Sequence, residues 1–153
     1  MSIKFTILGQ ACSKANSRQL VHFGKRIVPI KSAEALAYEK AALKQIPPAA
    51  RQRLEGPCRI TIHVYYESER PDLDPSVVLD CLQDRWEKVG AERVLTHKGV
   101  VRNDRQFREM HFFHGIDRHN PRAEIEIEPL VAQQPDMLEG VPRVMGELEK
   151  EPF

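Results

Sequence analysis

The chain has 153 residues, of which 41% are hydrophobic and 29% are charged. This length suffices for one domain with a hydrophobic core but not for two ordinary domains, and the composition excludes a disordered chain. The apolar runs are too short to cross a membrane, and the opening residues contain no apolar signal core. Three scattered cysteines, an odd number, are typical of reduced thiols. We therefore expect a cytoplasmic protein with no membrane partner.

The formal net charge of +1 hides a strong gradient along the chain. Residues 1–53 contain ten Lys and Arg against two acids, a net of +8, whereas residues 129–153 carry two bases and five acids, a net of −3. A basic segment of this size indicates a polyanionic partner, most commonly a phosphate backbone. The alternative is that these bases only solvate helix faces.

The first half of the chain predicts a strand, a hairpin, a helix and a second strand. Apolar residues alternate over 3–8, which is typical of a strand with one buried side. Residues 19–23 and 26–30 flank Gly24-Lys25 and indicate a hairpin. Ser32 can cap a helix in which Leu36, Leu43 and Ile46 supply apolar contacts before two prolines end it. Residues 59–68 alternate most clearly and predict a well-buried strand.

The second half predicts a central helix and a final strand. Pro75 fits a first helical turn, with Asp74 as its N-cap, and apolar residues recur at helical spacing at Val78, Leu82, Trp86 and Val89. Residues 90–99 resemble a loop that contains one short element of its own. Residues 99–101 resemble a brief strand and 123–128 a final strand, whereas 108–113 fit either a strand or a helix end. We expect an α/β (α+β) domain over 1–128, a small mixed β-sheet with two main helices, and an acidic, flexible tail over 129–153.

Three aspartates suggest a site for a divalent cation. Asp72 and Asp74 lie two residues apart, so on an extended backbone both carboxylates point to one side. With a third carboxylate from Asp104, they offer the oxygen ligands that Mg²⁺ prefers, and Mn²⁺ is an alternative ion. Asp80 and Asp84, one helical turn apart, could add an outer carboxylate. The competing interpretation is that these acids only cap and solvate a helix.

Basic residues in loops near these acids suggest a nucleic-acid surface. The polar segment 10–18 clusters donors suited to phosphate oxygens. The candidate DNA-binding residues are Lys14, Arg18, Lys25, Arg26, Lys31, Arg70 and Arg105.

Over roughly residues 3–128 the chain resembles the RusA-type Holliday-junction endonucleases, common in phages and prophages. The likeness lies in four segments: GQACSKANSR, KSAEALAYE, RPDLD and GVVRNDRQF. The resemblance implies a RusA-like fold, a homodimer, and Mg²⁺-dependent cleavage of four-way DNA junctions in recombination and repair. Carried over by position, it implies that Asp72, Asp74 and Asp104 are catalytic metal ligands.

The chain departs from the family pattern at three positions. Pro75 stands where the family usually has Asn, Val78 stands where it usually has a lysine, and Asn103 keeps only the second carboxylate of an acidic pair, at Asp104. The connection between the central helix and the next strand is also longer than usual. The lost lysine matters because a cation near the scissile phosphate stabilises charge in the transition state. Lys14 or Arg105 are candidate substitutes.

Two other functions remain open from the sequence. One is a catalytically weak or inactive protein that binds DNA junctions with the basic surface alone. The other is a zinc site at His111, His114 and His119, which is disfavoured because His111 and His114 would point to opposite faces of a strand and no cysteine has ligand spacing. For Cys81 and Trp86 we expect core packing.

Overall fold

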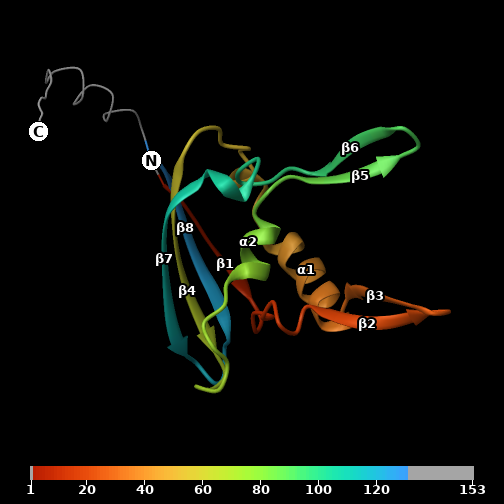
Figure 1. The fold of residues 1–153 in the computed structure, drawn as a ribbon. Coiled ribbons are helices and arrows are strands. Elements are labelled where there is room, and N and C mark those ends of the chain that lie inside the picture. Colours follow the sequence, from red (N-terminus) through yellow and green to blue (C-terminus); the bar gives the residue numbers. More distant parts are fainter. Residues whose placement is uncertain (1, 131–153) are drawn as a thin grey trace, which may run out of the picture.

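A four-stranded sheet forms the centre of the protein in the computed structural model, which describes residues 2–130. Its strands are β1 (Ile3–Leu8), β8 (Arg122–Pro129), β4 (Cys58–Tyr66) and β7 (Phe107–Ile116), in that spatial order (Figure 1). Because β8 is antiparallel to β1 and β4, and β7 is parallel to β4, three strands share one direction. Their carboxyl ends therefore lie at the same edge of the sheet.

Alternation of side chains in β4 sets the two faces of this sheet. Ile60, Ile62, Val64 and Tyr66 are almost completely buried, whereas the residues between them are half-buried. The predicted strand is thus confirmed, and its backbone is hydrogen-bonded on both sides, to β7 and to β8. Residues 108–113, which fitted either a strand or a helix end, lie within the edge strand β7 (Phe107–Ile116).

The first predicted helix is confirmed as α1 (Ala33–Gln45), capped by Ser32, whose Oγ accepts from the Ala35 N–H at 3.2 Å. A short 3₁₀ turn, η1 (Pro48–Ala50), follows it. The expected contact of Leu36 is wrong, because this side chain is 52% exposed. Ala35, Tyr38, Glu39 and Ala42 form the buried side instead, since small alanines allow the helix to approach the core closely.

The central helix is much shorter than the sequence predicts. It is α2 (Ser76–Cys81), six residues long, and its N-cap position is Pro75, not Asp74, although the Asp74 carboxylate accepts from the Ser76 N–H at the start of the helix. Trp86 and Val89 belong to β5 (Arg85–Val89), which pairs through a two-residue turn at Gly90-Ala91 with β6 (Glu92–His97). Residues 90–99, expected to be a loop with one short element, therefore consist mainly of a hairpin strand, β6. Core packing is confirmed for Cys81, but Trp86 is 44% exposed.

Two hairpins project from the same side of the body (Figure 1). One is the predicted hairpin, β2 (Arg18–Phe23) paired with β3 (Arg26–Lys31), and the other is β5–β6. Each is a separate two-stranded sheet. We call them the β2–β3 arm and the β5–β6 arm.

The fold class is as predicted: a mixed α+β single domain with one principal sheet and two helices. The final strand is also confirmed, and it continues to Pro129, which the sequence assigns to the tail. Residues 131–153 of the predicted tail lie outside the described residues. Within residues 2–130, every helix is too short or too polar to cross a membrane.

Candidate functional site

Asp72 and Asp74 lie just beyond the carboxyl end of β4, where open sheets commonly place ligand sites. Both line an open pocket of about 430 Å³ whose other wall is the loop after β1. The Asp74 N–H donates to the Tyr66 hydroxyl at 3.1 Å. Burial, followed by the charges of Asp74 and Asp72, raises the pKa of Tyr66. The two carboxylates therefore share one environment, as their spacing predicts.

Asp74 connects the β1 loop to the start of α2. Its Oδ2 accepts from the Lys14 N–H at 2.8 Å, and its Oδ1 accepts from the Ser76 N–H at 3.1 Å. Burial opposes its ionisation, but the hydrogen bonds from Ser76 and Lys14 outweigh burial and lower the pKa of Asp74. Asp74 is therefore a negatively charged oxygen donor at neutral pH.

Asp104 lies toward the opposite end of the sheet from Asp72 and Asp74. It begins the 3₁₀ turn η2 (Asp104–Gln106), which leads into the amino end of β7. Since β7 runs parallel to β4, with Cys58 opposite Phe107 and Tyr66 opposite Ile116, the two loops leave from opposite ends of strands roughly 26 Å long. Helix α2, which starts beside Asp74, is about 9 Å long and so spans only part of the distance toward Asp104. At its end the Gln83 side chain accepts from the Asp104 N–H at 3.0 Å.

Asp80, in the last turn of α2, is the acid that interacts electrostatically with Asp104. Burial raises the pKa of Asp80, and the Asp104 carboxylate raises it further, whereas Lys14 and Lys31 oppose the shift. A half-buried carboxyl group beside a second carboxylate is an environment that a bound cation would relieve. The sequence indicated Asp80 only as an outer carboxylate.

The acids of residues 2–130 do not form a ready-made metal cluster. Among residues 2–130, no group of three or more His, Cys, Asp or Glu side chains is arranged to hold a metal ion. Asp72, Asp74 and Asp104 therefore do not converge in this structure as a three-ligand site, and their sharing one ion stays a prediction. The chemistry of the donors still fits Mg²⁺, because this ion is usually held by only one or two carboxylates together with water and substrate phosphate.

The departures at Val78 and Asn103 have structural explanations. Val78 is completely buried, so this position on α2 serves the core. Asn103 caps η2, accepting from the Arg105 N–H at 2.8 Å, and Gln106 completes a reciprocal capping box. Lys14 is the base whose charge acts on both Asp74 and Asp80. Of the two candidate substitutes for the lysine, Lys14 has the better position, because the Arg105 side chain bonds to Asn103.

The predicted DNA-binding residues divide into three groups. Arg18 and Lys31 pair across the base of the β2–β3 arm and line a cleft of about 340 Å³ with Asp80, Arg85 and Trp86. Lys25 and Arg26 lie at the turn of this arm. The others are dispersed: Lys14 and Arg70 flank the acidic pocket, and Arg105 lies at η2.

Asp84 is a structural residue, not an outer ligand. It lies beyond the end of α2, not on it, and its carboxylate accepts from the Arg53 guanidinium at 2.8 Å and from the Gly99 N–H at 2.8 Å. Burial opposes its ionisation, but these bonds lower the pKa of Asp84. The sequence placed it one helical turn after Asp80 because it extended the helix too far.

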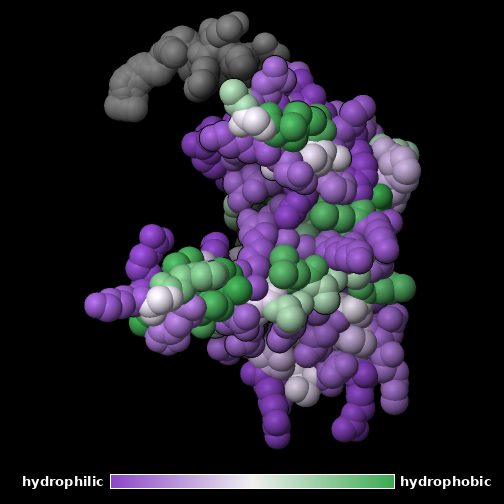
Figure 2. All heavy atoms as spheres, turned by 90° about the vertical axis from the view of Figure 1, so that its right-hand side faces the viewer, coloured by the Kyte–Doolittle hydropathy of each residue, from purple (hydrophilic) through white to green (hydrophobic). Residues whose placement is uncertain are grey.

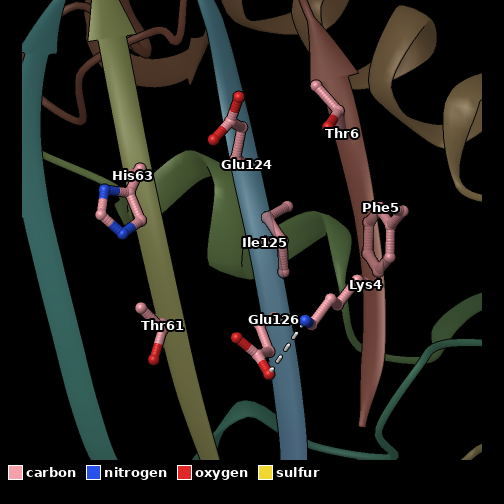
Figure 3. Close-up of a pocket in the computed structure, with 8 residues that line it drawn as sticks. All are labelled: Lys4, Phe5, Thr6, Thr61, His63, Glu124, Ile125 and Glu126. Atoms are coloured by element: carbon pink, nitrogen blue, oxygen red, sulfur yellow. Dashed lines mark ion pairs between the residues drawn. The ribbon is translucent and has the colours of Figure 1, made fainter.

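A second pocket lies on the face of the sheet opposite α1 and α2 (Figure 3). Figure 3 shows Lys4 directed at Glu126, with a separation of 3.9 Å, and His63 on the neighbouring strand. His63 alternates with buried residues along β4, and Lys4 and Glu126 do so along β1 and β8, so all three are on the other side of the sheet from the core. His111 and His114 likewise occupy opposite faces of β7, as their spacing predicts.

No protein-family model matches this chain, and the comparison with curated proteins finds no similar sequence. The fold and the site define a mixed α+β domain in which acidic side chains follow the central strand and its short helix, with two projecting arms beside them.

Proposed function

We propose that this protein is a Mg²⁺-dependent, structure-selective DNA endonuclease of the RusA type, which resolves four-way junctions. The observation that carries the proposal is a series of three acids, Asp74 just before α2, Asp80 in its last turn and Asp104, whose N–H bonds to Gln83 just past its end, beside a cleft lined by Arg18, Lys31 and Arg85. Acids alone would repel DNA, and bases alone would only bind it. Their combination is suited to phosphodiester hydrolysis.

In this proposal the acids hold the ion and the bases hold the DNA. Asp72, Asp74 and Asp104 are the proposed ligands of Mg²⁺, with Asp80 as a further candidate beside Asp104. When bound, Mg²⁺ polarises the phosphoryl group, increases the acidity of the attacking water and stabilises the leaving oxygen. Lys14, whose backbone is fixed by Asp74, supplies the positive charge that the buried Val78 does not.

Substrate phosphates complete the site in this account. Because Mg²⁺ commonly binds between one or two carboxylates and a phosphate, the separated acids do not need to form a closed cage beforehand. Recognition depends on backbone shape more than on base sequence. A two-fold homodimer would match the symmetry of a four-way junction and present two sites for the paired cuts.

A second candidate function is non-catalytic binding of DNA junctions. Two observations favour it: the described residues contain no assembled three-acid cluster, and Val78 occupies the position of the family lysine. This alternative keeps the basic arms and assigns the acids to helix capping.

One experiment separates the two functions. The full chain is incubated with a synthetic four-way junction, labelled in turn on each strand, with Mg²⁺ or with a chelator. Nicks are resolved on denaturing gels, and retarded complexes are resolved on native gels. A linear duplex of the same sequence is the control. The nuclease predicts paired, symmetric nicks in the junction with Mg²⁺ alone, whereas a retarded complex without nicks would overturn the proposal in favour of the binding protein.

A further inference from the structure

The β5–β6 arm separates its charges onto two faces. Cross-strand pairing places Lys88 opposite Arg93 and Trp86 opposite Leu95, so these four side chains share one face. Val89 opposite Glu92 and Glu87 opposite Val94 make up the other face. Every cation of the paired segment 86–95 is therefore on the tryptophan face, and both glutamates are on the reverse.

The cationic face is turned toward the β2–β3 arm. Trp86 lines the cleft whose far wall is formed by Arg18 and Lys31. Those two residues pair with each other across the base of the β2–β3 arm and so lie on one face of it. The cleft thus has basic side chains on both walls, together with Asp80 and Asp84. Its Lys31 and Arg85 are both paired with the buried Glu39. Figure 2 shows this side of the molecule, with hydrophobic side chains (green) beside hydrophilic ones (purple) on the projecting β2–β3 arm.

The base of the β5–β6 arm is fixed to the body, whereas its outer part is exposed. Arg85 donates to the buried Glu39 at 3.0 Å, and Thr96 donates to the Arg85 carbonyl at 3.1 Å. Farther out, the Arg93 guanidinium lies 5.1 Å from the centre of the Trp86 ring. A two-stranded ribbon is marginally stable alone in water, so these anchors keep its cationic face toward the cleft.

We propose that the β5–β6 arm is a second DNA-binding arm, which contacts the phosphate backbone through Lys88 and Arg93 opposite the β2–β3 arm. A two-stranded ribbon has the width to enter the major groove, and the paired cations Lys88 and Arg93 can then reach phosphates at the edge of the groove. Trp86 adds a flat apolar surface for sugar or exposed bases. The inference depends on the proposed function for its ligand, DNA, but it does not depend on cleavage.

The test measures binding of a fluorescent four-way junction in chelator, over a series of salt concentrations. The double variant Lys88→Gln/Arg93→Gln is compared with Glu87→Gln/Glu92→Gln, which neutralises as many charges on the opposite face. Two lost phosphate contacts reduce the salt slope of log K by about 1.8 and weaken binding roughly 60-fold at 0.1 M salt. The glutamate variant keeps the wild-type slope. An unchanged slope in Lys88→Gln/Arg93→Gln overturns the proposal.

Two further measurements test the arm: the fluorescence of Trp86 in the wild type, and sedimentation of Lys88→Gln/Arg93→Gln. Trp86 is the only tryptophan in the chain, so its fluorescence in the wild type reports on this arm directly. Saturation with junction DNA is expected to change its emission, and unchanged emission contradicts the proposal. Sedimentation tests a second copy of the chain as the occupant: conversion of Lys88→Gln/Arg93→Gln from dimer to monomer would overturn the DNA contact.

These results also separate the arm from the nuclease. Normal cleavage and normal binding by Lys88→Gln/Arg93→Gln would remove the arm assignment and leave the proposed function intact. Reduced binding by this variant, with a wild type that does not cut, would support the arm and remove the nuclease.

Discussion

Replacement of Asp84 by alanine tests how the base of the β5–β6 arm is held. Asp84 directly precedes β5, and Gly99 follows β6, so the 2.8 Å bond from the Gly99 N–H to the Asp84 carboxylate joins the two ends of this segment. The Arg53 guanidinium donates to the same carboxylate, whose side chain is only 2% exposed. Asp84→Ala would leave the buried Gly99 N–H without its acceptor.

The expected loss follows from these buried bonds. Removing one member of a buried charge pair lowers the free energy of unfolding by about 3–5 kcal/mol. Because Arg53 remains partly exposed to solvent, we expect a loss at the lower end of this range, about 3 kcal/mol, for Asp84→Ala. For a chain of this length, that loss lowers the melting temperature by about 10 °C. Chemical and thermal unfolding followed by circular dichroism at pH 7 measures both values.

The pH dependence gives a second readout of the same pair. The pKa of Asp84 is lower in the folded protein than in the unfolded chain, where it is about 4. The ionised Asp84 therefore stabilises the folded protein at pH values above the unfolded pKa, and this stabilisation is lost as the pH falls through the lower folded pKa. The difference between wild type and Asp84→Ala should therefore shrink in acid. Glu55→Ala is the control: it breaks the exposed 2.9 Å contact of Glu55 with Arg102 and should cost about 0.5 kcal/mol or less. Equal stability of Asp84→Ala and Glu55→Ala would refute this reasoning.

Three further predictions follow from close packing, buried thiols and the acid pair. A Cβ at Gly99 would lie 2.4 Å from backbone atoms, whereas a Cβ at Gly115 would lie 2.6 Å from the Tyr65 ring, which can move. Gly99→Ala should therefore lower the melting temperature more than Gly115→Ala, and the reverse order would contradict this packing. Burial raises the thiol pKa of all three cysteines: Cys12 to about 11, Cys81 to about 12, and Cys58. At pH 8 a disulfide reagent should therefore react with these thiols only after the protein unfolds, and rapid reaction of the native protein would contradict their burial. Asp80→Asn removes a charge beside Asp104 and should weaken Mg²⁺ activation of cleavage, seen as a higher Mg²⁺ requirement; an unchanged requirement would exclude Asp80 from the site.

The sequence predicted the elements whose side chains alternate or cap in a regular way. Strand β4 and the Ser32 cap of α1 are examples, because their signals are local. The β5–β6 arm was missed because Val78, Leu82, Trp86 and Val89 happen to keep helical spacing across a real helix end. The signal that could have identified it is the Gly90-Ala91 pair between two runs of alternating residues, which is typical of a two-residue hairpin turn.

The candidate site was only partly predictable, for a topological reason. The environment that Asp72 and Asp74 share follows from a spacing of two residues at the end of one strand. The position of Asp104 depends on the parallel pairing of β4 with β7, a contact between residues about 50 apart in sequence, which no local pattern specifies. For the same reason the sequence did not predict that Asp104 bonds to Gln83, just past the end of α2, or that its charge acts on Asp80.

Cleavage and binding by Asp74→Asn test the central claim most directly. Asp74 is ionised at neutral pH and lines the acidic pocket, and asparagine preserves its size while removing the charge. The proposed nuclease predicts that Asp74→Asn binds a four-way junction as tightly as wild type and makes no paired nicks with Mg²⁺. Full cleavage by this variant would contradict the account, because the reaction would then proceed without its best-positioned carboxylate.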